Sequence, residues 1–267
     1  MSKSLQRITY VELQRSKSSA TSSLPHGERQ RSFSVVRNNE PKEVTMQKFD
    51  TPAPVTAVLD VPAGHIRFIA ADRADTAVEV LPAHASRSRD VKAAEQTEVV
   101  YGDGVLRIKT PEAKSQILGP SGSIEVTVQL PAGSRIEAKA ALAEFRGVGR
   151  LGDVFIEGAQ GTVRLDETAC ARLALQSGDV SVGRLGGPAE ISTQKGDLRI
   201  AEAVRGTVTL CTGRGEISVG AARGVSASLD ADTSYGRIHN ALKNTDGTAG
   251  LNIHATTAHG DITARSL

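Results

Sequence analysis

The sequence of this 267-residue chain predicts an all-β fold, a β-solenoid built from stacked repeats of about twenty residues. Three observations predict it. A phrase of Gly, a mostly acidic residue and an aliphatic residue recurs, apolar residues alternate around it, and aromatic residues are few, with five Phe, three Tyr and no Trp. Repeats of this length cannot bury an apolar face alone, so they stack. The phrase begins at Gly152, Gly178, Gly196, Gly215, Gly236 and Gly260, at successive steps of 26, 18, 19, 21 and 24 residues.

Residues 1–45 precede the first coherent strand pattern and are rich in Ser, Arg, Lys and Asn. This composition predicts a disordered, basic, Ser-rich tail, and a mis-assigned start, with translation beginning at Met46, is the alternative. The segment carries a net charge of +4, which leaves −2 for residues 46–267. A near-neutral folded part with few aromatic rings argues against nucleic-acid binding. No apolar run could span a membrane and no secretory signal is visible, so we expect a cytoplasmic protein.

An irregular β-strand portion is expected over residues 46–145. Two Pro-Ala-Gly phrases, residues 62–64 and 131–133, follow strands and are interpreted as the same structural unit used twice. A hairpin is expected around Gly102–Gly104. Ser88–Gln96 has helical composition and is expected to form a loop or one short turn. The expected strands are Val55–Val61, Ile66–Ile69, Thr76–Leu81, Glu98–Tyr101, Val105–Lys109, Ile124–Leu130 and Ile136–Ala138.

The repeat solenoid itself is expected over residues 146–267. Apolar residues stand at odd offsets before each glycine, such as Leu210 before Gly215, and at even offsets after it, such as Ile217. Period-two alternation marks a strand, and the switch of parity marks a corner, so each repeat reads strand, corner, strand and return turn. A sandwich or barrel of hairpins is the alternative, although Gly-rich stretches, not two-residue turns, join the repeats. Four threonines three residues before a glycine predict an inward or corner-facing ladder: Thr193, Thr212, Thr233 and Thr257.

The residue after the glycine forms a candidate acidic ladder: Asp153, Asp179, Asp197, Glu216 and Asp261, with Arg237 in the sixth phrase. If the repeats stack, these carboxylates line one edge. Carbohydrate-cleaving parallel β-helices use acidic residues on neighbouring rungs as acid and base, so an enzyme of that kind is one hypothesis. Asp after Gly also favours tight corners and keeps an edge soluble. Because corner chemistry explains these residues, and no Trp is present to stack on a sugar, we predict no catalytic residues.

The remaining reactive side chains form no recognisable site. Cys170 and Cys211 are expected about two rungs, or roughly 10 Å, apart, which is too far for a disulfide, so free thiols are predicted. The three histidines of the last two repeats occupy different offsets without a paired Cys, so no metal site is predicted. Residues 147–152 match a Gly-x-Gly-x-x-Gly string, but no helix follows, so no nucleotide or other cofactor is expected.

These phrases together resemble a known family. The sequence is similar to the bacterial β-strand-repeat proteins of the putative-adhesin family, a domain of unknown function. The residues that carry the resemblance lie in the two Pro-Ala-Gly phrases and in the repeats at 176–180, 193–198, 233–240 and 258–263. The resemblance covers about residues 46–267. It implies a β-solenoid-like fold and supplies no accepted catalytic residues.

The expected function is that of a non-enzymatic binding or assembly module. Its long regular faces would engage an unknown protein partner or a second copy of the chain. Exposed solenoid ends are strand edges that must be capped or paired. Only a few residues follow Gly260, so self-association or docking is expected at that end. A surface adhesin anchored by a separate system is a third hypothesis.

Overall fold

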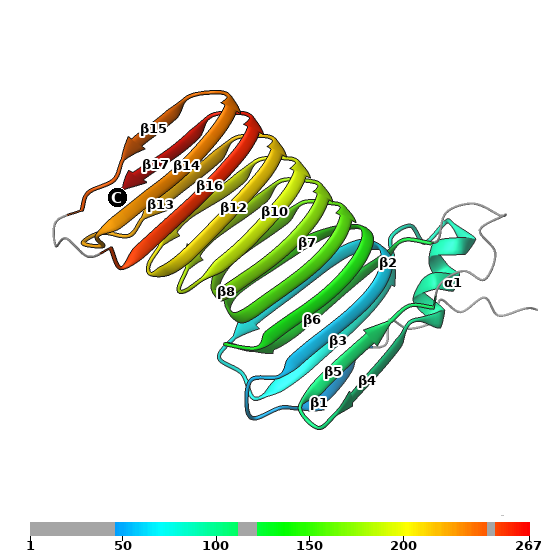
Figure 1. Cartoon of the computed structure of the whole chain (residues 1–267). Coiled ribbons are helices and arrows are strands. Elements are labelled where there is room, and N and C mark those ends of the chain that lie inside the picture. Colours follow the sequence, from blue (N-terminus) through cyan, green and yellow to red (C-terminus); the bar gives the residue numbers. More distant parts are fainter. Residues whose placement is uncertain (1–45, 112–121, 245–248) are drawn as a thin grey trace, which may run out of the picture. The chain divides into compact units, whose positions relative to one another are not determined.

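The computed structural model describes residues 46–111, 122–244 and 249–267, and the expectation for residues 1–45 lies outside this part of the chain. The predicted all-β fold is confirmed. Seventeen strands of the described residues belong to one continuous sheet, and they are joined in the order of a stack (Figure 1). Most neighbouring strands are parallel and aligned residue for residue, so that Ile191 lies between Leu173 and Leu210. This is the stacked β-solenoid expected from the repeats.

Each rung of the stack contributes one strand to a first face and one to a second face, joined at a corner. Parallel pairing holds within each face. The first face contains β10 (Ala189–Lys195), β12 (Gly206–Arg214), β14 (Ala227–Tyr235) and β16 (Leu251–His259). The second face contains β9 (Val180–Leu185), β11 (Leu198–Ala203), β13 (Ile217–Ala221), β15 (Ile238–Ala241) and β17 (Ile262–Ser266).

Three long strands run from one face into the other without losing strand conformation and so serve both faces: β2 (Thr56–Ala71), β7 (Arg135–Gln160) and β8 (Val163–Ser177). The Pro-Ala-Gly phrase at 62–64 therefore lies inside β2, whereas the phrase at 131–133 starts at the last residue of β6 and ends in a turn at Gly133 (φ 80°). The two phrases are not the same structural unit. β7 also runs through residues 145 and 146, where we placed the boundary between the two β portions.

Antiparallel strands close the N-terminal end of the stack. On the first face, β5 (Val105–Lys109) pairs with β2, and β4 (Glu98–Gly102) pairs antiparallel with β5 through the expected hairpin, where Asp103 and Gly104 have positive φ. On the second face, β6 (Ile124–Pro131), β3 (Asp75–Pro82) and β1 (Gln47–Asp50) follow β2 in that order. The change of direction ends the regular stack at this side.

A helix, α1 (Ser88–Gln96), stands where we expected a loop or one short turn, so that expectation was wrong. Tertiary contacts explain the difference. Ala93 is buried in the core, and the buried carboxylate of Asp90 accepts a hydrogen bond from the backbone N–H of Ser123 at 3.1 Å. Such contacts stabilise a short helix whose own propensity is insufficient.

The order of the rungs in space differs from their order in the sequence at the C-terminal end. β16 lies between β12 and β14, and β17 lies between β13 and β15. The last rung in the sequence is therefore inserted into the stack, and β14 and β15 form its end (Figure 1). We expected the rung after Gly260 to be the exposed one. Insertion pairs it on both sides, and the preceding rung takes the end position.

The core consists mainly of aliphatic side chains, with Phe68 and Phe145 among them, stacked in columns between the two faces. One column on the first face comprises Ile156, Leu173, Ile191, Leu210 and Ala255, all buried and in register from strand to strand. Because rungs lie only about 4.8 Å apart, each layer has room for side chains of this size, which accounts for the low aromatic content.

Candidate functional site

The corner between the two faces is a column of backbone close approaches. Gly178, Gly196, Gly215 and Gly260 have φ between 145° and 155°, and a Cβ at Gly196 would overlap the carbonyl oxygen of Gly178 on the neighbouring rung. Gly236 stands at the end of the same column, over Gly260. Stacking of identical corners therefore requires glycine at this place.

Gly152 lies outside the column, and its place is taken by Gly161, whose Cβ would overlap the carbonyl oxygen of Ala143. The corner of that rung follows residue 160, because the first-face part of β7 ends there. Gly152 instead begins that part, where its N–H donates to the carbonyl of Ser134 at 2.9 Å. The phrase Gly-Asp-Val at 152–154 resembles the others in sequence but stands at a return turn.

The acidic ladder is a set of hydrogen bonds between rungs. Asp179 Oδ1 accepts the backbone N–H of Asp197 at 2.9 Å, and Asp197 Oδ1 accepts that of Glu216 at 2.8 Å. Asp261 Oδ1 accepts the N–H of Arg237 at 2.9 Å. At these corners the N–H of the residue after the glycine points back to the previous rung, and the carboxylate supplies its acceptor. Asp153, at the return turn, pairs instead with the guanidinium of Arg135 at 3.6 Å.

Arg237 interrupts the ladder because it belongs to the end rung. No further rung among the described residues offers an N–H for an acidic side chain there to accept. Its guanidinium instead reaches back to Asp261 Oδ2, at 2.8 Å from Nη2, and this contact lowers the pKa of the Asp261 carboxyl. The position of Arg237 in the sequence pattern thus marks the end of the stack.

The threonine ladder completes the corner. Thr212 donates its hydroxyl to the carbonyl of Gly196 at 3.0 Å, and Thr257 donates to that of Gly215 at 3.1 Å. Thr233 makes the same bond to Gly260, whereas Thr193 donates to Lys195 within its own rung. Carbonyl groups at the corner therefore find partners on the next rung, which keeps buried polar groups satisfied.

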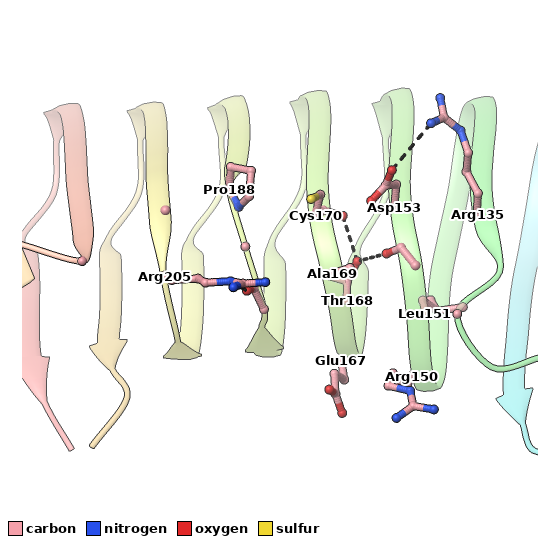
Figure 2. A pocket seen from close by; sticks show the side chains of 16 residues that line it. Arg135, Arg150, Leu151, Asp153, Glu167, Thr168, Ala169, Cys170, Pro188 and Arg205 are labelled. Atoms are coloured by element: carbon pink, nitrogen blue, oxygen red, sulfur yellow. Dashed lines mark hydrogen bonds and ion pairs between the residues drawn. The ribbon is translucent and has the colours of Figure 1, made fainter. Parts of the chain in front are cut away.

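A groove of about 900 Å³ runs across the return turns, on the opposite edge of the stack from the corner (Figure 2). Its floor consists of small residues from successive rungs, from Gly133 through Gly152, Ala169, Gly187 and Gly206 to Gly250. Five strand spacings give it a length of about 24 Å. A Cβ at Gly187 would lie 2.8 Å from the carbonyl oxygen of Ala169, so close stacking of the turns already explains that glycine.

Three exposed arginines and two carboxylates give the groove its charge. Asp153 pairs with Arg135, and Glu167 lies 4.0 Å from Nε of Arg184 on the next rung. Arg150 and Arg205 also line the groove and form no ion pair within the part of the chain that the structure describes. The side-chain Nε of Arg205 donates to the carbonyl of Gly186 at 3.2 Å, which holds its guanidinium at the groove. Two cations are thus available to a bound anionic group.

The Cys170 thiol is not activated as a nucleophile by its surroundings. It lines the groove, where burial and the nearby Asp153 carboxylate raise its pKa. A raised pKa keeps the thiol protonated near neutral pH, and only the thiolate is a good nucleophile. Cys211 is exposed on β12, and both cysteines are free, as predicted.

The end of the stack is a second open surface. Within the described chain, β14 pairs only with β16 and β15 only with β17, so each presents one unpaired strand edge. Tyr235 is 70% exposed and Ile238 is 47% exposed, whereas Ile262, which lies beside Ile238 one rung inward, is 1% exposed. The Tyr235 ring stacks on His259 with centroids 4.9 Å apart.

The histidines do not converge. His259 stacks with Tyr235, and His254 Nδ1 lies 3.3 Å from Asp230 Oδ2. Across the described ranges, no group of three or more His, Cys, Asp or Glu side chains has the arrangement of a metal site. Among those residues, too, no helix is long and apolar enough to cross a membrane.

Sequence reasoning missed the groove, and it expected an open end but assigned it to the wrong rung. The groove lies on return turns, whose lengths vary from rung to rung, so its arginines share no fixed offset from the corner glycine. The Gly-rich stretch at 183–187 was the available signal, since part of it forms the groove floor. The end rung had another signal, which was Arg237 in place of an acidic residue.

The sequence profile of the Toastrack DUF4097 family matches residues 6–265. The chain belongs to this family. The match begins before Met46, where we expected the resemblance to start. None of the curated proteins compared matches the Toastrack chain.

Solved structures of similar proteins include a putative cell adhesion protein from Clostridium sporogenes, with 13% identity, coverage of 84% of this chain and 100% of that chain, and a TM-score of 0.40. A putative adhesin from Parabacteroides distasonis has 12% identity, coverage of 84% and 98%, and a TM-score of 0.45. A putative lipid binding protein from the same organism has 12% identity, coverage of 82% and 96%, and a TM-score of 0.44. The family profile, and not these structures, decides the assignment.

Proposed function

We propose that this Toastrack chain is a non-enzymatic binding and assembly module whose partner is a protein, either another polypeptide or a second copy of itself. The observation that carries the proposal is the groove across the return turns, where Arg150 and Arg205 have no carboxylate partner among the described residues. A groove about 24 Å long fits an extended segment. Its two available guanidinium groups favour a segment that carries carboxylates.

The acidic ladder supports a binding role over the alternative of a carbohydrate-active enzyme. The carboxylates of Asp179 and Asp197 each accept a backbone N–H from the next rung. These bonds give both carboxylates a structural role, so no catalytic role is needed to explain the two residues. Replacing Asp197 with Asn and testing a panel of polysaccharides separates the two functions, because an enzyme would lose hydrolysis and a binding module has none to lose.

Capture of partners from a native lysate, followed by mass spectrometry, tests the proposal. The full chain is immobilised beside the double variant Arg150→Glu, Arg205→Glu and beside Arg199→Glu, an exposed arginine on β11 away from the groove. We expect a protein that the wild type and Arg199→Glu retain and that the double variant loses. Equal retention by all three proteins would contradict binding through the groove.

The location of the chain is part of the proposal. We propose the cytoplasm as that location. Fractionation of cells, with an antibody against the chain, distinguishes this location from the surface position that an adhesin requires.

A further inference from the structure

The end rung exposes a cross-section of the core. Leu229 and Ala231 of β14 are only half-buried, although Ile253 and Ala255, their neighbours on β16, are each 1% exposed. On β15, Ile238 is likewise exposed, although its neighbour Ile262 on β17 is buried. One more rung would bury these side chains and pair both strand edges, as every inner rung does for its neighbour. The opposite end is built differently, because short antiparallel strands, β4 and β1, form its edges and α1 packs against β3 and β6.

A rung from a second copy can meet this end with its strands antiparallel in two ways. In one, β14 pairs with β14 of the second copy. Full overlap then sets Asp230 opposite Asp232 of the second copy and the reverse, and like charges directly opposite destabilise an antiparallel pair. In the other arrangement, the second copy is rotated by half a turn about an axis parallel to the strands. β14 then lies beside β15 of the second copy, and the corners of the two copies lie at the same edge of the dimer. The charges of β14 therefore select the second arrangement.

We propose that two copies of the chain join end to end in this second arrangement, with Tyr235 opposite Ile238 of the second copy and Ile238 opposite its Tyr235. The proposal rests on the proposed binding and assembly function and names the second copy as the partner of this surface. Each of the two most exposed apolar side chains of the end rung then covers the other. The unpaired edges of β14 and β15 become paired.

The same register brings opposite charges together. Counting outward from the Tyr235–Ile238 pair, Ser234 lies opposite His239 of the second copy. Continued past the end of β15 at Ala241, the same count places Lys243 at the level of Asp230 of the second copy; the backbone N–H of Lys243 donates to Ser266 Oγ at 2.9 Å, so the chain still runs beside β17 there. Asp230 and Lys243 are both exposed. Lys243 follows Leu242, which packs against the core, so the side chains of Lys243 and Asp230 both point outward. The two-fold symmetry makes this pair twice.

Sedimentation equilibrium at low salt tests the proposal with a charge swap at Asp230 and Lys243, which are exposed enough to be replaced without loss of folding. We expect the wild type to dimerise. Asp230→Lys and Lys243→Glu should each weaken the dimer by about tenfold, because each turns two attractive pairs into repulsive ones. An equimolar mixture of the two variants should restore dimers, since every pair in the mixed dimer is attractive. Lys92→Glu and Glu98→Lys, at the opposite end of the stack, are the matched controls and should dimerise as the wild type does.

A second comparison probes the apolar contact. Ile238→Lys should yield a monomer, whereas Leu142→Lys, which replaces a similarly exposed apolar side chain on β7, should not. A wild type that stays monomeric up to about 1 mM overturns the proposal. Dimers that the single charge variants leave intact, or a mixture that fails to restore them, also overturn it. A monomer that still captures a partner through Arg150 and Arg205 retains the proposed function, and a monomer that captures nothing loses both.

Discussion

The residue after a corner glycine accepts a backbone hydrogen bond from the rung that follows it in the stack. Alternate N–H groups of a strand point to opposite neighbours, and at the corner one of them lacks a carbonyl in reach. Asp179 and Asp197 each provide the acceptor, while Thr212 gives the Gly196 carbonyl its donor. An acidic residue after glycine is thus favoured twice, by turn preference and by the need of the next rung.

Removal of one such acceptor should lower the stability of the fold, because it leaves one backbone N–H without a hydrogen-bond partner. We expect Asp197→Ala to lower the free energy of unfolding by about 1 kcal/mol, because the Glu216 N–H loses its partner. Asp197→Asn keeps an oxygen acceptor and should cost less than half as much. Chemical denaturation followed by circular dichroism measures both. Glu190→Ala is the control, since among the described residues that carboxylate bonds only the exposed Arg172 side chain. Equal effects of Ala and Asn at position 197 would contradict a role as acceptor.

The Cys170 thiol should be slow to react because its pKa is raised, first by burial and second by Asp153. In a Cys211→Ser background, its alkylation by iodoacetamide should still be rising steeply at about pH 9, where an ordinary thiol of pKa about 8.5 is mostly ionised. Asp153→Asn removes the carboxylate but not the burial. We expect it to lower the pKa of the thiol and to speed alkylation at pH 8 by about threefold, because a larger fraction of the thiol is then thiolate. An unchanged rate would show that burial alone controls this thiol.

At the scale of elements, the inserted rung is the feature that most changes the surface of the protein. β16 and β17 separate β14 and β15 from the strands that precede them in the sequence. The inserted rung gains partners on both faces, and the rung with Arg237 takes the end. Arg237 and the exposed carboxylates of β14 are the kind of charges that edge strands carry.

Engineered disulfides to the native Cys211 should report this order of strands. Cys211 lies beside Thr256 on β16, and Thr256 lies beside Asp232 on β14. In a Cys170→Ser background, we expect Thr256→Cys to form an intramolecular disulfide on mild oxidation, because adjacent strands are about 4.8 Å apart. Asp232→Cys, about twice as far away, should not. Ser192→Cys, beside Cys211 on β10, is the positive control.

A peptide map under non-reducing conditions identifies the linked pairs, and a gel separates them from disulfides between two chains. If Cys211 formed an intramolecular link to the introduced thiol in Asp232→Cys but formed none in Thr256→Cys, the rungs would stack in sequence order.

At the scale of the whole molecule, the sequence predicts the repeating parts and fails where a rung departs from the repeat. Period-two alternation and the glycine steps are sufficient to predict the stacked strands, because every inner rung packs against two neighbours in the same way. Gly152 misleads because a Gly-Asp phrase also suits a return turn. The insertion of β16 and β17 has no local signature, since their residues fit an inner position as well as an end position. α1 depends on contacts of Asp90 and Ala93 with residues distant in the sequence.

Stability should vary along the stack, because each rung contacts only its neighbours. Inner rungs have two, whereas β14 and β15 pair on one side only among the described residues. Among the strands from β10 to β17, and at a concentration that keeps the chain monomeric, we expect hydrogen exchange to be fastest in peptides from β14 and β15 and slowest in those from β10 to β13. Peptides from β16 and β17 should resemble the inner rungs despite their place near the C-terminus. Fast exchange of β16 and β17 together with slow exchange of β14 and β15 would contradict the insertion. At high concentration, the β14 and β15 amides of the wild type should gain protection while those of Lys243→Glu do not, because only the wild type then pairs these edges with a second copy.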